Sequence, residues 1–134
     1  MLLLTTHQAG GDPLNTGLDV FCMDAAGPGG AHHAYTICWR DYNGNAHVCH
    51  IHFQTGGVRE PRSDVAGAPL NGVNGTSDEA LLAIVQHRLE CFQQGPFACD
   101  QNATALAHVT EALAALHARS QDRLARGVEG VHQA

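Results

Sequence analysis

Residues 76–126 constrain the fold most strongly, because their pattern predicts two helices folded back on each other. Thr76-Ser77-Asp78-Glu79 has the capping-box spacing that begins a helix. Gln94-Gly95-Pro96 then separates two runs of apolar residues, and so predicts a turn between two helices. Within each run the apolar residues recur at steps of three and four, at Leu82, Val85, Leu89 and Phe92 and at Leu106, Val109, Leu113 and Leu116.

The second helix is predicted to begin near Cys99 or Asp100 and to end at Arg126, with Gly127 as a C-terminal stop. Its length of about 27 residues corresponds to roughly 40 Å. Each helix carries a narrow apolar seam, and alanines flank the seam of the second helix. One chain cannot cover both sides of such a hairpin, so we expect a homo-oligomer.

The first part of the chain indicates an antiparallel β-meander, because apolar and polar residues alternate within three short runs between residues 18 and 54. The segments between these runs are rich in glycine, proline and asparagine, which favour turns. The sequence therefore predicts a single α+β domain over residues 1–134. Its parts are a β-meander at 18–54, a loop at 55–75, a helical hairpin at 76–127 and a tail at 128–134.

Composition excludes several classes of function. A net charge of −6 argues against binding to long nucleic acid, which needs a basic surface. No run approaches the roughly 20 apolar residues of a membrane helix, and Met1-Leu2-Leu3-Leu4 is too short for a secretion signal. Five cysteines without a dense framework favour reduced thiols in a cytoplasm.

All seven cationic residues are arginines, which suits a small anionic ligand, although a bias in genome composition explains the preference equally well.

Histidines raise the question of a metal site. Of the ten, His50 and His52 lie on one face of a predicted strand, and three others (His32, His33 and His47) fall near Cys38 and Cys49. No CxxC or HExxH motif is present, so surface histidines are favoured over a metal site. We expect no metal and no cofactor. The sequence also lacks a nucleophile elbow, a P-loop and paired carboxylates, so we predict no catalytic residues and no enzyme activity.

Arg119, Arg123 and Arg126 recur at steps of four and three, on one face of the last turns of the second helix. Two interpretations stay open. The arginines can be solvated cations that interact favourably with the helix dipole. Alternatively, oligomer symmetry brings copies of one arginine together around a small polyphosphate or cyclic nucleotide.

Several of these segments together resemble a known family. They are Phe92-Gln93-Gln94-Gly95-Pro96-Phe97-Ala98-Cys99, then Asn102, Arg119 and Arg123, then Arg126-Gly127-Val128-Glu129-Gly130, preceded by Gly72-Val73-Asn74 and the run from Glu79 to Val85. They resemble the helical-hairpin domain of phage nucleotide sponges. The strands, with Phe53-Gln54 leading into the loop, resemble the Thoeris anti-defence branch more than the shorter, purely helical anti-CBASS sponges.

The resemblance implies a protein that sequesters cyclic nucleotide immune signals in the host bacterial cytoplasm without cleaving them. The expected partners are cyclic ADP-ribose isomers such as glyco-cyclic ADP-ribose, cyclic di- or trinucleotides at a separate kind of site, and further copies of the chain in a hexamer. Phe92 and Asn102 match positions used for the ADP-ribose ligand. Arg119 and Arg59 match arginines of the cyclic oligonucleotide pocket, with Asn74, Arg88 and Arg123 as neighbours.

Two departures from the family pattern affect these expectations. The loop at 56–71 is longer than usual, which leaves the alignment of Arg59 and Arg62 open. Asp100 stands where many relatives have arginine, which reverses a charge near the ligand.

Phe92 itself fits both a seam residue and a stacking residue. The alternatives are a metal-dependent enzyme that uses the sheet histidines and a structural phage protein that oligomerises through the hairpin.

Overall fold

A computed structural model describes residues 1–127, and the predicted tail at 128–134 lies outside the described residues. The chain forms two compact units, Met1–Thr55 and Gly56–Ala134. The first unit holds the sheet and the second holds the helices. The α+β order of an antiparallel sheet followed by two helices is therefore confirmed, whereas the expectation of a single domain stays a prediction.

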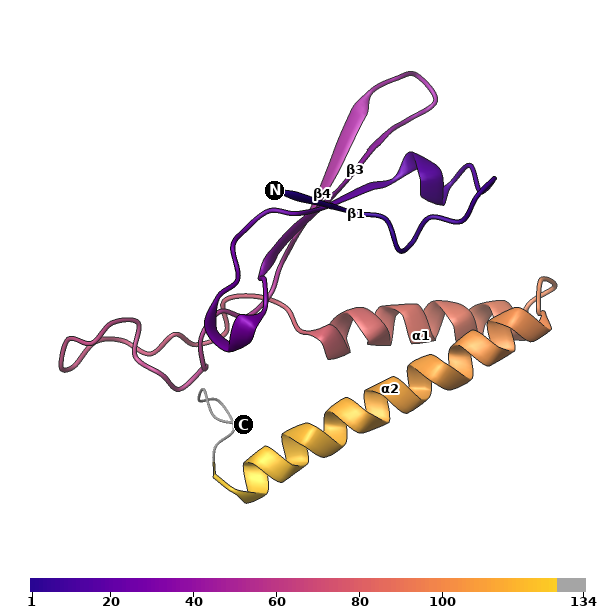
Figure 1. The fold of residues 1–134 in the computed structure, drawn as a ribbon. Helices are drawn as coiled ribbons and strands as arrows, with labels where there is room; N and C mark the ends of the chain where they lie inside the picture. The colour runs from indigo at the N-terminus through magenta and orange to yellow at the C-terminus, as the bar shows by residue number, and fades with distance from the viewer. Residues whose placement is uncertain (128–134) are drawn as a thin grey trace. The chain divides into compact units, whose positions relative to one another are not determined.

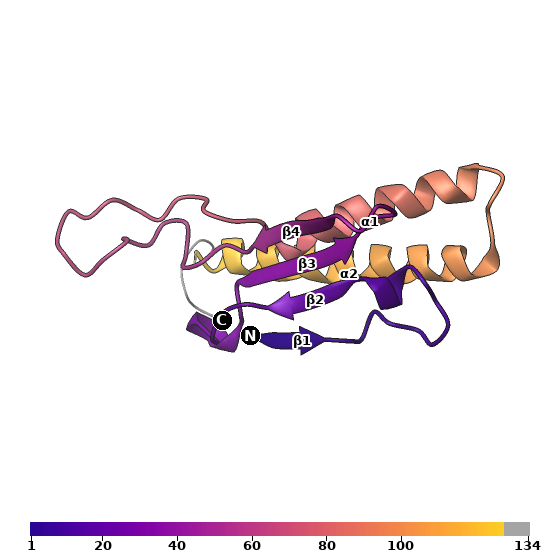
Figure 2. The same ribbon diagram turned by 90° about the horizontal axis from the view of Figure 1, so that it is seen from above.

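The first unit is a four-stranded antiparallel sheet in the order β1-β2-β3-β4 (Figure 2). The strands β2 (Asp19–Cys22), β3 (Ala34–Arg40) and β4 (Ala46–His52) lie within the predicted meander. The prediction of three strands was wrong by one, because β1 (Leu2–Leu4) pairs with β2 from Leu2↔Cys22 to Leu4↔Val20. Three consecutive leucines show no alternation, so the sequence pattern could not reveal this strand.

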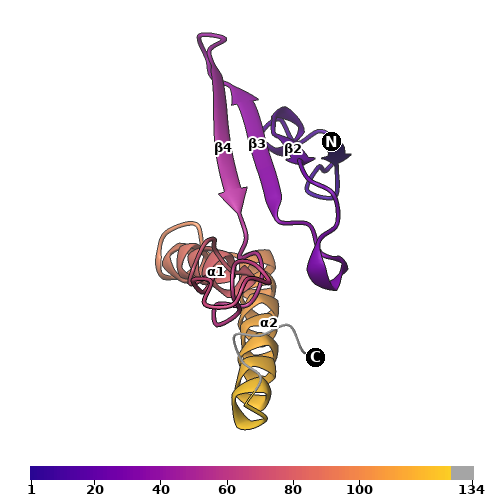
Figure 3. The same cartoon turned by 90° about the vertical axis from the view of Figure 1, so that its left-hand side faces the viewer.

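The longest pairing joins β3 and β4 and extends from Ala34↔His52 to Arg40↔Ala46 (Figure 3). Asp41 closes the turn between them, because its Oδ1 accepts hydrogen bonds from the backbone N–H groups of Asn43 at 2.9 Å and Asn45 at 3.0 Å. A hydrogen bond with the His47 side chain, followed by the Asn45 N–H, lowers the pKa of Asp41 below its usual value. The turn is thus fixed by an ionised carboxylate.

The second unit contains the helical hairpin, formed by α1 (Asp78–Gln94) and α2 (Asp100–Ala125), which run side by side in opposite directions (Figure 1). The predicted break at Gln94-Gly95-Pro96 is confirmed. Gly127 has a φ of +71° and its N–H donates to the Leu124 carbonyl at 3.0 Å, which confirms the glycine stop. No helix in the described part of the chain is both long and apolar enough to cross a membrane.

The less exposed residues of each helix follow a heptad-like spacing, with steps of three and four. In α2 the predicted seam is confirmed, with Leu113 buried at 7% exposure. In α1 the predicted seam is only half right, because Val85 and Phe92 are 44% and 40% exposed. The less exposed positions on this spacing are Glu79, Leu82, Gln86, Leu89 and Gln93 in α1 and Asn102, Leu106, Val109, Leu113, Leu116, Ser120 and Arg123 in α2, and Leu81 and Ala105 beside them are also less exposed.

Residues 56–75 connect to the helices as the predicted loop, but the loop is locally closed. The N–H of Asn71 donates to the Glu60 carbonyl at 2.8 Å, and the N–H of Gly72 donates to the Val58 carbonyl at 3.0 Å. Within the same loop, Pro61 pairs with Leu70 in an isolated antiparallel bridge. The loop is therefore a hairpin-like arm that satisfies part of its own backbone.

The start of α1 corrects one sequence prediction. The N-cap residue is Ser77, whose Oγ accepts a hydrogen bond from the Ala80 N–H at 3.1 Å. The cap therefore lies one residue later than the expected box between Thr76 and Glu79, and Glu79 forms an ion pair with Arg119 instead.

Replacing Ser77 by alanine is expected to lower the free energy of unfolding by about 1 kcal/mol, because the N–H of Ala80 loses its acceptor at the helix start. Denaturant unfolding followed by circular dichroism measures the change. Thr76→Ala is the matched control and should change stability much less. A larger loss for Thr76→Ala than for Ser77→Ala would place the cap one residue earlier.

Candidate functional site

An open hollow of about 480 Å³ lies at the end of α1, beside the bend between the two helices. The last two turns of α1 supply one wall and the bend supplies the other. The lining is mainly apolar, with few polar atoms. The lining residues are His87, Arg88, Cys91, Phe92, Gly95, Pro96 and Phe97.

Phe92 and Arg88 lie next to each other on the wall of this hollow. They are four residues apart on α1, so they share one face of the helix. The Arg88 guanidinium carbon lies 5.8 Å from the centre of the Phe92 ring, in a cation–π arrangement. Phe92 is 40% exposed, so its ring is accessible in the described chain, whereas its stacking role stays a prediction. The hollow thus offers an aromatic face beside a cation.

A thiol and an imidazole lie in the same hollow. Cys91 Sγ is 3.6 Å from His87 Nε2, again at a spacing of four residues. The thiol donates to this nitrogen when the ring carries its proton on the other one. The contact orients both side chains on the wall of the hollow.

Asn102, the second residue matched to the ADP-ribose ligand, does not line the hollow. It is half-buried in the first turn of α2, and its backbone N–H donates to Cys99 Sγ at 3.4 Å. The structure therefore places Phe92 and Asn102 near the same bend, but of the two only Phe92 lines the hollow. It joins Phe92 with Arg88, which the resemblance had grouped with the cyclic oligonucleotide residues.

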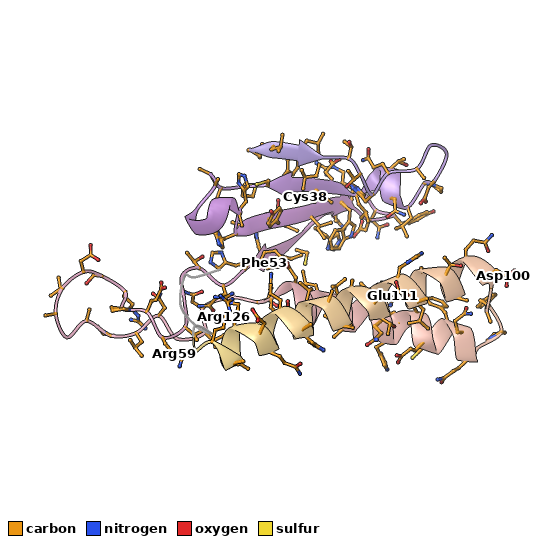
Figure 4. All side chains as sticks on the ribbon, turned by 60° about the horizontal axis from the view of Figure 1, so that its bottom comes forward. Cys38, Phe53, Arg59, Asp100, Glu111 and Arg126 are labelled. Atoms are coloured by element: carbon orange, nitrogen blue, oxygen red, sulfur yellow. The ribbon has the colours of Figure 1, made fainter. Side chains whose placement is uncertain are left out.

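Arg119 lies near the other end of the hairpin. One of its terminal nitrogens is 3.5 Å from Glu79 Oε1, and the two side chains are 56% and 27% exposed. Glu79 and Phe92 are thirteen residues apart on α1, which corresponds to roughly 20 Å along the helix. Figure 4 shows Asp100 and Arg126 at opposite ends of α2. The arginine end and the Phe92 hollow are therefore separate places on the hairpin.

The remaining arginines at this end differ in exposure. Arg123 is half-buried, whereas Arg126 is exposed and its Nε forms an ion pair with Asp122 Oδ2 at 3.0 Å. Arg59 and Asn74 are both exposed in the segment before α1, where Figure 4 labels Arg59 in the loop. Neither lines the Phe92 hollow.

The predicted sheet histidines do not gather at one point. His47 Nε2 is 2.8 Å from Asp41 Oδ2, and its ring stacks on Trp39 at 5.5 Å with an interplanar angle of 11°. His50 and His52 are exposed on β4. Among the described residues, the cluster with metal-ligating atoms combines His32 with Cys22 and Asp24 instead. The sequence signal for it, Cys-x-Asp before a glycine-rich turn, was missed.

Comparison with known proteins supports the resemblance found in the sequence. No family model matches the chain. A protein of Bacillus phage SBSphiJ7, described as Thoeris anti-defense 1, is 36% identical over 107 residues, which are 80% of this chain. The matched part is 66% of that protein, so the chain spans just under two thirds of its length. The chain belongs to the Thoeris anti-defence family.

Proposed function

We propose that the chain is a phage anti-defence protein that binds and sequesters cyclic nucleotide immune signals without degrading them. Membership of the Thoeris anti-defence family supports the anti-defence role. The single observation that carries the binding role is the Arg88–Phe92 pair in the open hollow at the end of α1. The signals we propose are cyclic ADP-ribose isomers such as glyco-cyclic ADP-ribose.

The chemistry of the hollow suits this class of ligand. A cyclic ADP-ribose isomer carries an adenine ring and a pyrophosphate. A phenyl ring stacks on the adenine, and a guanidinium forms charge-assisted hydrogen bonds with phosphate oxygens. A sponge also lowers the free signal by mass action alone, so it needs affinity and abundance and no catalytic group.

We further propose that the protein works as a homo-oligomer, most simply the hexamer expected from the family. α1 supports this, because Ile84, Val85 and Phe92 are 59%, 44% and 40% exposed on one helix. Apolar side chains left uncovered in this way are covered when copies associate. In that assembly the hollow is completed by a second copy, and Arg119, Arg123, Arg59 and Asn74 belong to a second kind of site, for cyclic di- or trinucleotides.

Incubation followed by recovery tests sequestration directly. The full chain is mixed with a glyco-cyclic ADP-ribose isomer, and the free nucleotide is removed by filtration. The protein is then denatured, and the released nucleotide is identified by chromatography. We expect the signal to be depleted from the filtrate and recovered intact after denaturation, because binding leaves its bonds unchanged.

The control is the same protein denatured before incubation, which should leave the signal in the filtrate. Recovery of chemically altered nucleotide would instead identify an enzyme. No depletion with any cyclic ADP-ribose isomer or cyclic oligonucleotide would reject the sponge and favour a structural, oligomerising protein. A thermal-shift series gives a second readout, since ligand at about 100 times its dissociation constant adds about 2.7 kcal/mol of stability.

A further inference from the structure

The turn between β2 and β3 is organised by the carboxylate of Asp24. One carboxylate oxygen, Oδ2, accepts a hydrogen bond from the His33 N–H at 2.9 Å, and the other, Oδ1, accepts from the Ala34 N–H at 3.1 Å. Partial burial acts to raise the pKa of Asp24, but these N–H groups and the nearby His32 ring together bring it below its ordinary value. Asp24 is therefore an ionised carboxylate held in a fixed orientation.

Two further side chains converge on this carboxylate. Cys22 Sγ lies 3.9 Å from Asp24 Oδ1, and His32 Nδ1 lies 3.8 Å from the same oxygen. The ligating atoms of the three residues all lie within 4.8 Å of one another. In a tetrahedral zinc site, bonds of about 2.0–2.3 Å separate neighbouring ligand atoms by about 3.3–3.5 Å. The two separations from Asp24 Oδ1 exceed this spacing by about half an ångström, and the third is at most 4.8 Å. Side-chain movements of up to about 1 Å therefore bring the three atoms around one ion.

We propose that Cys22, Asp24 and His32 form a zinc-binding site at the junction of β2 and β3. The expectation from the sequence was that the protein holds no metal, and the proposal departs from it on the strength of this convergence. We choose zinc because the three ligand atoms are a thiolate sulfur, an imidazole nitrogen and a carboxylate oxygen, which are the usual ligands of Zn²⁺.

Exposure of the three groups fits an ion that is reached from one side. Cys22 is 3% exposed, whereas the side chains of His32 and Asp24 are 38% and 31% exposed. The sulfur therefore lies at the protected side of the site, and water supplies the fourth ligand from the open side. The buried His33 ring lies 3.9 Å from the other oxygen of Asp24 and supports its orientation.

Zinc binding exchanges hydrogen bonds for metal bonds. In the chain as it stands, the Cys22 thiol lies 3.6 Å from the Asp24 carbonyl, and His32 Nδ1 lies 2.8 Å from the same carbonyl. On binding, a sulfur–zinc bond forms and the thiol proton passes to solvent, while the imidazole binds through its neutral nitrogen. One proton is released from Cys22, so affinity rises with pH. The ion then ties the end of β2 to the residues just before β3.

The test uses the full chain, stripped with a chelator and titrated with Zn²⁺ alone against a chromophoric chelator. We expect one equivalent of Zn²⁺ per chain. Cys22→Ser and His32→Gln should each weaken binding by about tenfold or more, since each removes a ligand. With Co²⁺ as a spectroscopic substitute, the sulfur-to-metal charge-transfer absorption should appear and should be lost in Cys22→Ser.

Two substitutions on β4 serve as matched controls, Cys49→Ser and His50→Gln, because both residues are exposed and lie outside the cluster. Both controls should bind Zn²⁺ as the natural chain does. Cys22 is buried, so Cys22→Ser can disturb folding, and the more exposed His32→Gln keeps the test decisive. Absence of stoichiometric binding, survival of tight binding in His32→Gln, or an equal loss in the controls would overturn the proposal.

Discussion

Replacing Phe92 by alanine is expected to weaken binding of a cyclic ADP-ribose isomer by about 10- to 100-fold. Stacking of a base on an aromatic side chain contributes about 1–3 kcal/mol, and a change of 1.4 kcal/mol is a factor of ten in affinity. The loss also frees the Arg88 guanidinium, which lies 5.8 Å from the ring centre, from its position over the ring. Isothermal titration calorimetry with the intact chain measures the change.

Ile84→Ala is the matched control for Phe92→Ala. Ile84 is also an exposed apolar residue of α1, at 59% exposure, but it does not line the hollow. If copies of the chain associate through α1, Ile84→Ala reports the effect of that association on binding without removing the ring. Unchanged affinity in Phe92→Ala would show that the ring does not contact the ligand, and an equal loss in both variants would assign the loss to association of the copies.

The hairpin was predictable because helix starts, stops and apolar spacing are local signals. The seam of α2 was right for the same reason, since its inward positions are Leu106, Val109, Leu113 and Leu116. The predicted seam of α1 was only half right, because glutamines occupy two of its inward positions. Gln86 Nε2 donates to Thr110 Oγ1 at 3.2 Å, and Gln93 Oε1 accepts from the Cys99 N–H at 3.1 Å.

This polar seam explains how Phe92 becomes available for binding. Hydrophobicity alone places the apolar residues of α1 toward the partner helix. Hydrogen bonds across the hairpin instead satisfy the glutamines there, and Phe92 turns to the open hollow beside Arg88. Which side of a helix meets its partner depends on these pairings between distant residues, which one sequence does not display.

The candidate sites also divide into arrangements that local sequence determines and arrangements that depend on distant residues. The arginines of α2 were predicted to lie together, since their spacing is a local property of one helix. The pairing of Arg119 with Glu79 joins residues 40 positions apart, and the grouping of Cys22, Asp24 and His32 depends on the shape of a glycine-containing turn. The first arrangement requires the relative placement of two helices. The second requires the fold of the turn that brings His32 back to Cys22 and Asp24, and only the Cys-x-Asp spacing is visible in the sequence.

Replacing Arg119 by glutamine is expected to weaken binding of a cyclic trinucleotide by about tenfold or more and to leave binding of a cyclic ADP-ribose isomer unchanged. Hydrogen bonds to charged groups contribute about 1.5–3 kcal/mol, and glutamine keeps the length of a polar side chain without the charge. The Phe92 hollow lies at the other end of the hairpin, so its ligand should not respond. Calorimetric titration of the same variant with both ligands measures the contrast.

The ion pair between Arg119 and Glu79 supplies the deciding control, because the 3.5 Å contact gives Arg119 a structural role that would also be lost in Arg119→Gln. Glu79→Gln removes the same ion pair but keeps the guanidinium. If Arg119 holds a phosphate, Glu79→Gln binds the cyclic trinucleotide as well as the natural chain or more tightly, since a competing carboxylate is gone. If Arg119 only stabilises the hairpin, both variants lose stability together, and binding of the two ligands falls in parallel.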